Sequence, residues 1–332
     1  LKADMSHAVG RSTLRMSATG ADTRYDESLE PGGDARYRQR FLSVAAESEI
    51  PLGGSPETAG FGLVFGASVD GSDTPETGAR PGRAAIWDWG AKAAGTYVFP
   101  GKATRVHAGL SRRTRAPSLR ELYSGALGRF VVNPDLGPET LTASEVGITY
   151  GRSDFELQAV GFHHRLEDAV VRVSAGDGRF RRVNRDRVLA TGLEFVGSAT
   201  WGALSTRIDL TLQDVRLEDP TAPDAQRQPE YQPWIAGSMA IGGRLPLDLR
   251  GQLRLAHVGS QYCVHPDLAR DVSLQASTWA DVELARTWRL GGSRSRWLRV
   301  VGGVQNLADA AVYDQCGLPA PGRRLILSLE IG

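Results

Sequence analysis

Cysteine and histidine side chains are the groups in this chain best suited to bind a metal ion or act as nucleophiles. The two cysteines, Cys263 and Cys316, have no Cys-x-x-Cys spacing, which argues against a structural zinc site or a thioredoxin-like redox site. His163 and His164 are adjacent, so in a strand their rings would point to opposite faces and could not share one ion. His265 lies close to Cys263, which leaves two interpretations open: a metal-capturing loop, or an ordinary polar loop histidine.

Catalytic motifs do not stand out in the sequence. We find no Gly-x-Ser-x-Gly elbow, no His-Glu-x-x-His helix and no glycine-rich phosphate loop. Asp70-Gly-Ser-Asp73 and Asp177-Gly178 could suggest calcium, but they lack the EF-hand spacing and are better explained as turns. We therefore expect a protein that is not an enzyme and that needs no cofactor or metal.

The composition excludes several classes of protein. The 332 residues include 39 Lys and Arg against 38 Asp and Glu, a net charge of +1 that argues against nucleic-acid binding. Hydrophobic residues make up 41%, too many for a disordered chain, while 39 glycines and 17 prolines suit short elements joined by turns. No uncharged stretch reaches the roughly 20 apolar residues that a membrane-spanning helix needs, which leaves a membrane β-barrel open.

Alternation of apolar and polar side chains is the dominant pattern. It is clearest in Leu204–Asp214, Leu247–Leu255 and Leu325–Ile331. In a β-strand this alternation places the apolar groups on one face and the polar groups on the other. We find about fourteen such segments, and the only helix we expect is a short one where Ser118-x-x-Glu121 forms a capping box.

Two β architectures fit this alternation, a soluble β-sandwich and a transmembrane barrel. The connections favour the barrel, because short and long ones alternate along the chain, as they do in up-and-down outer-membrane barrels. The long connections, which we expect to be outer loops, lie near residues 22–36, 70–83, 115–140, 174–186, 214–232, 261–273 and 308–322.

Aromatic side chains also favour the barrel. Tyr97, Phe99, Tyr150, Trp201 and Trp288 lie beside short connections and share the parity of the apolar face, as an interfacial aromatic girdle requires. The sequence therefore predicts an all-β, antiparallel up-and-down transmembrane β-barrel. Its polar face would line a wet interior or contact something inside it; the charged residues predicted there are Arg207, Asp209, Arg250, Arg254, Asp281, Glu283, Arg299 and Glu330.

Four blocks in the sequence carry a resemblance to a known family. They are Arg115-x-Pro117 with Glu121-Leu122; Asn133-Pro134-x-Leu136-x-Pro138-Glu139 with Glu145-x-Gly147; Gly192-x-Glu194; and Asn306-Leu307-x-Asp309 with Tyr313 and Pro321-Gly322-Arg323. In this order they resemble the later part of the barrel of TonB-dependent outer-membrane receptors. The resemblance covers residues 115–332, whereas residues 1–114 fit by strand rhythm only.

The resemblance implies a barrel of about 22 strands that is closed by a separate plug domain. On this basis we expect residues 1–332 to be a partial barrel domain, without the plug and the first strands, and therefore a fragment of a longer protein or a degenerate gene product. The family takes up large, scarce nutrients such as siderophore–iron complexes or cobalamin. Outer-membrane lipid, the plug and the TonB complex are the implied partners, and the outer membrane of a Gram-negative-type bacterium is the implied location.

Two alternatives to energised uptake stay open. One is a passive outer-membrane porin or adhesin barrel, and the other is a soluble β-sandwich that binds a ligand. Neither alternative predicts a plug domain, and only the sandwich would be released without detergent.

A disulfide follows from the predicted topology. Cys263 comes just after the strand Leu247–Gly259, and Cys316 follows the strand Leu298–Gln305, so both lie in neighbouring outer loops. Because that side of the cell is oxidising, disulfides persist there. We predict a Cys263–Cys316 bond between the last two outer loops; two free thiols are the alternative.

Overall fold

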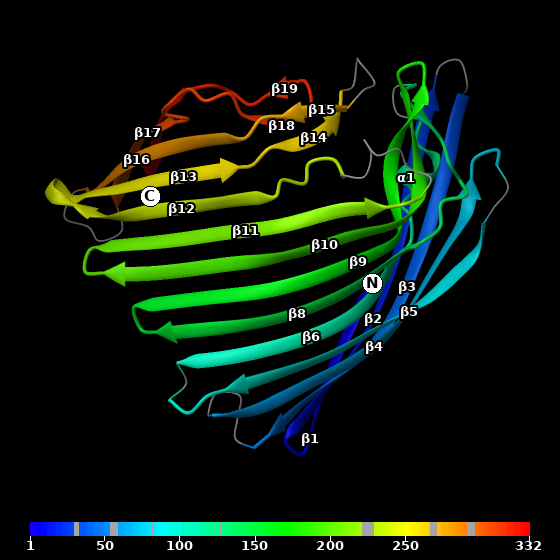
Figure 1. The fold of residues 1–332 in the computed structure, drawn as a ribbon, viewed down its shortest axis with the longest axis horizontal. Coiled ribbons are helices and arrows are strands. Elements are labelled where there is room, and N and C mark those ends of the chain that lie inside the picture. Colours follow the sequence, from blue (N-terminus) through cyan, green and yellow to red (C-terminus); the bar gives the residue numbers. More distant parts are fainter. Residues whose placement is uncertain are drawn as a thin grey trace. The chain divides into compact units, whose positions relative to one another are not determined.

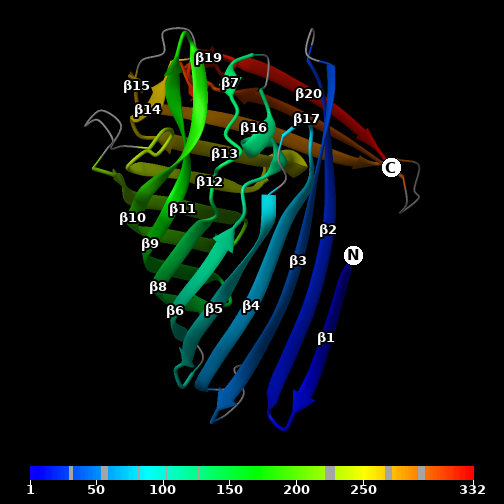
Figure 2. The same ribbon diagram turned by 90° about the vertical axis from the view of Figure 1, so that its right-hand side faces the viewer.

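The computed structural model describes residues 1–29, 33–53, 59–80, 83–101, 103–125, 128–220, 229–265, 271–290 and 296–332. Its main element is a 16-stranded sheet with the order β1-β2-β3-β4-β5-β6-β8-β9-β10-β11-β12-β13-β16-β17-β20 (Figures 1 and 2), and β7 pairs beside this path with β10. This confirms the predicted all-β fold, with 16 strands where the sequence indicated about fourteen. Within the described ranges, no helix is long and apolar enough to cross a membrane.

The chain forms two compact units. The first comprises Leu1–Gly147, Phe162–Thr191 and Arg216–Arg227, and the second comprises Ile148–Gly161, Gly192–Val215 and Gln228–Gly332. The elements that begin in the first unit are β1 (Lys2–Val9), β2 (Ser12–Leu29), β3 (Gly33–Leu52), β4 (Gly60–Thr77), β5 (Arg83–Val98), β6 (Thr104–Arg115), α1 (Leu119–Tyr123), β7 (Phe130–Val131) and β8 (Glu139–Arg152).

The long strands β9 (Phe155–Gly176), β10 (Arg179–Trp201) and β11 (Leu204–Glu218) each contribute residues to both units. The other elements belong to the second unit: β12 (Ile235–Leu245), the 3-10 turn η2 (Pro246–Asp248), β13 (Leu249–Val258), β14 (Gln261–Val264), β15 (Asp271–Leu274), β16 (Ser277–Arg289), β17 (Trp297–Gln305), β18 (Tyr313–Gln315), β19 (Leu318–Pro319) and β20 (Arg324–Ile331).

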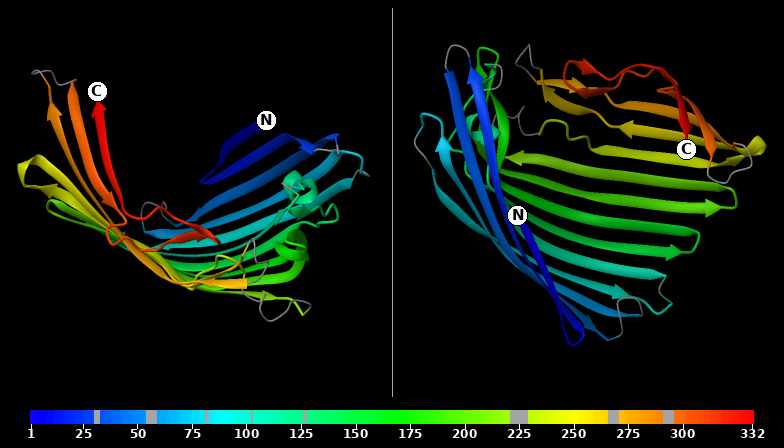
Figure 3. Two further views of the ribbon diagram at one scale, coloured as in Figure 1. Left: turned by 90° about the horizontal axis from the view of Figure 1, so that it is seen from above. Right: turned by 180° about the vertical axis from the view of Figure 1, so that it is seen from behind.

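Several strands run further than the sequence indicated. β2 and β3 pair without a break from Thr13 opposite Glu49 to Leu29 opposite Gly33, and lie side by side in Figures 2 and 3. The expected loops 22–36, 70–83 and 174–186 are therefore wrong in extent, because most of their residues continue the strands. Polar residues occupy both faces there, so these segments carry no apolar alternation, yet their backbone groups still pair in the ladder.

One face of the first unit's sheet is apolar. On β3, Leu42 and Val44 are 47% and 53% exposed, whereas Tyr37 and Gln39 on the opposite face are 6% and 2% exposed. The indole of Trp87 lies so close over Gly71 that a Cβ on this glycine would come within 2.7 Å of the ring. A side chain at position 71 would therefore force the Trp87 ring to shift.

The other face carries a line of paired charges. Arg15 of β2 lies 3.2 Å from the Glu47 carboxylate and 3.0 Å from that of Glu49, and Glu47 also pairs with Lys92 of β5. The Lys92 side chain reaches Glu47 across Gly66 of β4, where a Cβ would lie 3.1 Å from the lysine chain. This polar face is the one on which α1 packs.

The buried core of the first unit lies under α1. It consists of Tyr37, Leu119, Leu122, Tyr123 and Leu136, and is flanked by Tyr25, Ala35 and Val170. The rings of Tyr25 and Tyr37 stack at 5.7 Å, and those of Tyr37 and Tyr123 at 4.8 Å. We use the name α1 platform for α1, the core residues named above and residues 128–139.

We expect Leu136→Ala to loosen the α1 platform while leaving the strand ladder intact. Leu136 is fully buried, and removing a buried leucine side chain typically costs about 2–5 kcal/mol. Trypsin cleavage at Arg120 should become faster in this variant. Leu42→Ala, on the open face of β3, is the matched control and should not alter cleavage; equal cleavage rates in the two variants would contradict the platform's role.

Candidate functional site

The α1 platform begins with the capping box that the sequence predicts. The Ser118 hydroxyl accepts a hydrogen bond from the backbone N–H of Glu121, and the Glu121 carboxylate accepts one from the backbone N–H of Ser118 at 2.8 Å. This reciprocal pairing satisfies donors that a helix start otherwise leaves open. The helix has only five residues, so tertiary packing must hold it.

Arg115 ties this helix to the sheet. Its guanidinium donates to both Glu121 carboxylate oxygens, at 2.8 and 3.0 Å, and to the Glu139 carboxylate at 2.6 Å. Glu139, at the start of β8, also accepts a 2.6 Å hydrogen bond from the backbone N–H of Val170 on β9. One arginine thus links the end of β6, the helix and β8, which gives Arg115, Glu121 and Glu139 of the family blocks a structural role.

Opposing effects act on the pKa of Glu121. Burial alone would raise this pKa, but the hydrogen bonds from Arg115 and Ser118 outweigh burial and lower it. The carboxylate is therefore ionised at neutral pH and serves as a fixed anion at the helix start.

Asn133 and the loop after it complete the platform. The Asn133 amide donates to the carbonyl of Arg182 at 2.8 Å, and Arg83 donates to the carbonyl of Leu136 at 2.7 Å. The Gly137 N–H donates to the Asn184 side chain at 2.8 Å, and the Asn184 amide donates back to the Gly137 carbonyl at 3.2 Å. The second family block therefore supplies loop-fixing contacts.

The remaining blocks lie elsewhere. In the strands, Glu145 lies 3.7 Å from the His164 ring. Gly192 and Glu194, on β10, belong to the second unit. Asn306 forms a closed turn, because its side chain exchanges two 2.8 Å hydrogen bonds with the backbone of Ala310. Asp309 accepts a 2.7 Å hydrogen bond from the N–H of Arg323, so the fourth block closes its own loop.

The two cysteines form a disulfide in the structure. Their sulfur atoms lie 2.13 Å apart, and the bond joins Cys263 of β14 to Cys316, which follows β18. The Tyr231 hydroxyl accepts a 3.1 Å hydrogen bond from the N–H of Cys316, and the Tyr231 N–H donates to the Tyr262 carbonyl at 2.9 Å. One tyrosine thus holds both sides of the bridge.

Some of the charged residues predicted for the polar face lie together in the structure, and others do not. In the second unit, Arg207, Arg250, Glu283 and Arg299 line a hollow of about 560 Å³, together with Arg244, which the sequence reasoning missed. Asp209 instead accepts hydrogen bonds from Ser238 at 2.9 and 3.0 Å. Arg254 and Asp281 occupy opposing register positions on β13 and β16, and Arg299 pairs with Glu330 at 3.2 Å.

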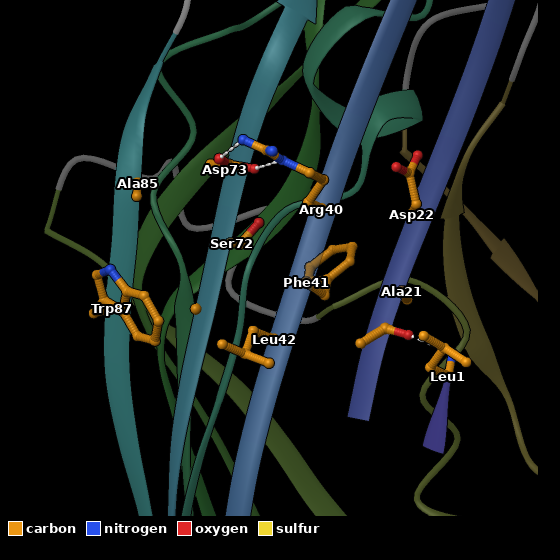
Figure 4. A pocket seen from close by; sticks show the side chains of 12 residues that line it. Leu1, Ala21, Asp22, Arg40, Phe41, Leu42, Ser72, Asp73, Ala85 and Trp87 are labelled. Carbon is orange, nitrogen blue, oxygen red and sulfur yellow. Dashed lines mark hydrogen bonds and ion pairs between the residues drawn. The ribbon is translucent and has the colours of Figure 1, made fainter. Parts of the chain in front are cut away.

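A pocket of about 480 Å³ lies on the apolar face of the first unit, over β2 to β5 (Figure 4). Leu42 and Trp87 line one part of it, and the ion pair between Arg40 and Asp73 lines the other. Trp87, Trp89 and Trp234 are highly exposed aromatic residues that the sequence reasoning missed. The sequence could have predicted the exposure of Trp87 and Trp89, because both share the parity of Tyr97 on the same strand and therefore lie on the same face.

Potential metal ligands form no cluster among the described residues. Across the described ranges, no three His, Cys, Asp or Glu side chains lie close enough to hold a metal ion. The His163 ring instead contacts the Thr191 hydroxyl at 2.8 Å.

The fold and the two-faced strands define the wall of an antiparallel β-barrel. The sequence matches the family model described as "TonB dependent receptor-like, beta-barrel" over residues 3–307. The chain therefore belongs to the family of TonB-dependent receptor β-barrels. A search of curated proteins finds no match.

Solved structures of several transporters and receptors have a similar fold. The FrpB iron transporter from Neisseria meningitidis has a TM-score of 0.74 at 13% identity, covering 99% of this chain and 54% of its own. The copper transporter OprC gives 0.74 at 14% identity, covering 98% and 55%. A mutant of the ferric enterobactin receptor PfeA from Pseudomonas aeruginosa, in complex with enterobactin, gives 0.67 at 18% identity, covering 99% and 53%. The chain thus spans about half the length of these proteins.

Acid should loosen the α1 platform. Because folding lowers the pKa of Glu121, its contribution to stability is present above the ordinary pKa of 4.5 and is lost as the pH falls through the folded value. Amide exchange in α1, corrected for its intrinsic pH dependence, should accelerate as the pH falls below this ordinary value. Glu121→Gln should destabilise the platform by about 1–3 kcal/mol at pH 7 and remove the acid effect. Glu76→Gln, at a side chain 53% exposed, is the control; an unchanged pH profile in Glu121→Gln would refute this account.

Thiol titration tests the disulfide in solution. The unfolded, unreduced protein should show no reactive thiol and should gain two after reduction. The bridge joins residues 53 positions apart, and loop-closure entropy then gives a stabilisation of about 4 kcal/mol. Two reactive thiols before reduction would mean that Cys263 and Cys316 are free.

Proposed function

We propose that this chain is the barrel portion of an outer-membrane receptor that takes up a scarce nutrient with energy from the TonB complex. Membership of the TonB-dependent receptor family is the observation that carries the proposal. The similar structures include proteins described as iron and copper transporters and a receptor in complex with enterobactin. These descriptions support a metal-bearing nutrient, such as a siderophore–iron complex, as the class of ligand.

The apolar face has the properties that contact with lipid requires. On β5, Trp89 and Tyr97 are 53% and 36% exposed on this face. They are eight positions apart, about 27 Å along a strand and about 19–22 Å across the membrane at a strand tilt of about 35–45°, which is slightly less than the apolar band of about 25 Å that aromatic residues flank. In this arrangement the paired charges of Arg15, Glu47 and Lys92 face the interior of the barrel.

The α1 platform is consistent with a receptor that holds ligand-facing side chains in fixed positions inside its barrel. The platform packs on the polar face of β3 and is held by Arg115 and by the buried amide of Gln39, which donates to the Pro117 carbonyl at 2.8 Å. Full-length relatives of about twice this length leave room for a plug domain in the whole protein.

Uptake measurements in the native host test the proposal. Deleting the gene should lower the uptake of radioactive iron supplied with a siderophore under iron limitation, and deleting the TonB gene or adding a protonophore should have the same effect. Uptake through this protein that persists without TonB would favour a passive pore. No effect of the gene deletion on any supplied iron, copper or cobalamin source would contradict the proposal.

The topology makes a separate prediction. The β9–β10 connection at Asp177 should lie outside the cell, and the β8–β9 connection at Ser153 should face the periplasm, because the two connections are at opposite ends of β9. In intact cells an impermeant maleimide should label Asp177→Cys and not Ser153→Cys. After lysis both should react. Labelling of Ser153→Cys but not of Asp177→Cys in intact cells would contradict this topology.

A further inference from the structure

The pocket on the apolar face of the first unit has an apolar floor (Figure 4). One row of residues crosses four strands at opposing register positions: Gly20 of β2, Leu42 of β3, Gly71 of β4 and Trp87 of β5. A Cβ on Gly20 would meet only the Phe41 carbonyl oxygen, at 3.9 Å, so the space beside the Leu42 side chain is open. The floor is therefore a shallow groove between Leu42 and the bare backbone of β2.

The next row toward the β2–β3 connection is charged. It lies two positions further along each strand and consists of Asp22, Arg40 and Asp73. Arg40 donates to both Asp73 carboxylate oxygens, at 2.9 and 2.5 Å, and Asp22 accepts hydrogen bonds from Arg38 at 2.9 and 3.1 Å. Because side chains two positions apart on a strand share a face, this row lies on the same face as Leu42.

Positive charge gathers on this face around Asp22. Arg24 and Arg38 occupy opposing register positions one row further out, and like charges directly opposite each other destabilise a sheet. The two arginines share the Asp22 carboxylate, which the 73% exposed Arg24 side chain approaches at 3.8 Å. The Arg40 side chain is 52% exposed. Since a guanidinium carries five N–H donors, Arg24 and Arg40 both keep donors for a further anion.

The two rows lie at the depth where a lipid changes from apolar to charged. Trp87 and Tyr97 are ten positions apart on β5, about 34 Å along a strand and about 24–28 Å across the membrane at a strand tilt of about 35–45°. This span matches the apolar band of about 25 Å. Trp87 therefore marks one edge of the band, and the charged row with Arg40 lies just beyond it, at the level of the headgroups.

We propose that this pocket binds a phosphorylated glycolipid of the outer leaflet, with one acyl chain in the groove beside Leu42 and a phosphate on Arg24 and Arg40. Phosphate oxygens match the planar fork of a guanidinium, and clusters of basic side chains next to an apolar surface recognise anionic lipids. Asp73 holds Arg40 in place, so little side-chain entropy of Arg40 remains to be lost on binding.

The position of the pocket along the strands indicates the outer leaflet. β2 and β9 both end at the same end of the first unit, the end at which the β9–β10 connection is predicted to lie outside the cell (Figure 1). The inference goes beyond the proposed uptake function: it rests on the outer-membrane location within that proposal, but not on transport. Contact with lipid in general needs apolar side chains alone, whereas the charged rows select a phosphate and make binding sensitive to salt.

Native mass spectrometry of the purified protein in a neutral detergent tests the site. The probe is bisphosphorylated lipid A, the glycolipid anchor of lipopolysaccharide. The protein should retain one lipid A molecule per chain, and retention should fall as the salt concentration rises. Lipid A without its phosphates should be retained about fivefold less. Inorganic pyrophosphate, which has phosphates but no acyl chain, should not displace the bound lipid.

Substitutions in the two rows separate the headgroup from the acyl chain. Arg24→Gln and Arg40→Gln should each weaken retention of lipid A about fivefold, because each removes a phosphate partner. Gly20→Leu should also weaken it, because the new side chain fills the groove where the backbone leaves room. Arg15→Gln is the matched control and should change retention less than twofold, since it alters a 50% exposed, ion-paired arginine on the opposite face of β2.

Photo-cross-linking keeps the test decisive if a variant folds poorly. In the unaltered protein, lipid A with a photoreactive group on an acyl chain close to its headgroup should cross-link to Leu42 and Trp87. It should cross-link much less to Phe61, which is 39% exposed on the same face of β4 at the other edge of the band. Equal cross-linking at the three positions would mean a general lipid coat and would overturn the proposal.

Three other results would also overturn it. They are equal retention of lipid A with and without phosphates, displacement of the lipid by pyrophosphate, and a loss in Arg15→Gln as large as that in Arg40→Gln. Absence of TonB-driven uptake with lipid retention intact would instead count against the transport function alone.

Discussion

Pairing of every strand with its neighbour through backbone hydrogen bonds is the interaction on which the rest of this structure depends. Each residue carries an N–H donor and a C=O acceptor that must find partners wherever water is excluded. The unbroken β2–β3 register from Thr13 to Leu29 satisfies these groups over a long ribbon. Because side chains alternate along each paired strand, one ladder creates both an apolar face and a polar face.

The two faces serve different roles because their side chains meet different surroundings. The apolar face presents large side chains such as Leu42, Val44 and Trp87 without covering them, an arrangement that suits lipid and would be costly in water. The polar face carries the linked charges of Arg15 and Glu47 and supports the α1 platform. Among the described residues of the first unit, the largest fully buried side chains include Leu122, Tyr123 and Leu136 of this platform, so the platform resembles a soluble protein core.

Regular features of the fold could be predicted from sequence, and features built from distant segments could not. Alternation in Leu204–Asp214 predicted a strand, and Ser118-x-x-Glu121 predicted the capping box, because both signals are local. The ribbon extensions were missed because residues polar on both faces resemble loops. The packing of Arg182 on the Phe130 ring was missed for another reason: these residues are far apart in sequence, and only the short β7–β10 pairing brings them together.

The central claim is that one face of each strand meets lipid and the other meets water inside a barrel. Spin labels placed singly at residues 41–46 of β3, in the protein reconstituted in bilayers, measure this directly. Collision rates with oxygen, which concentrates in lipid, should be high at Leu42 and Val44, and collision rates with a water-soluble nickel chelate should be high at Ser43 and Ala45. Equal accessibility at neighbouring positions, or the opposite parity, would contradict the claim.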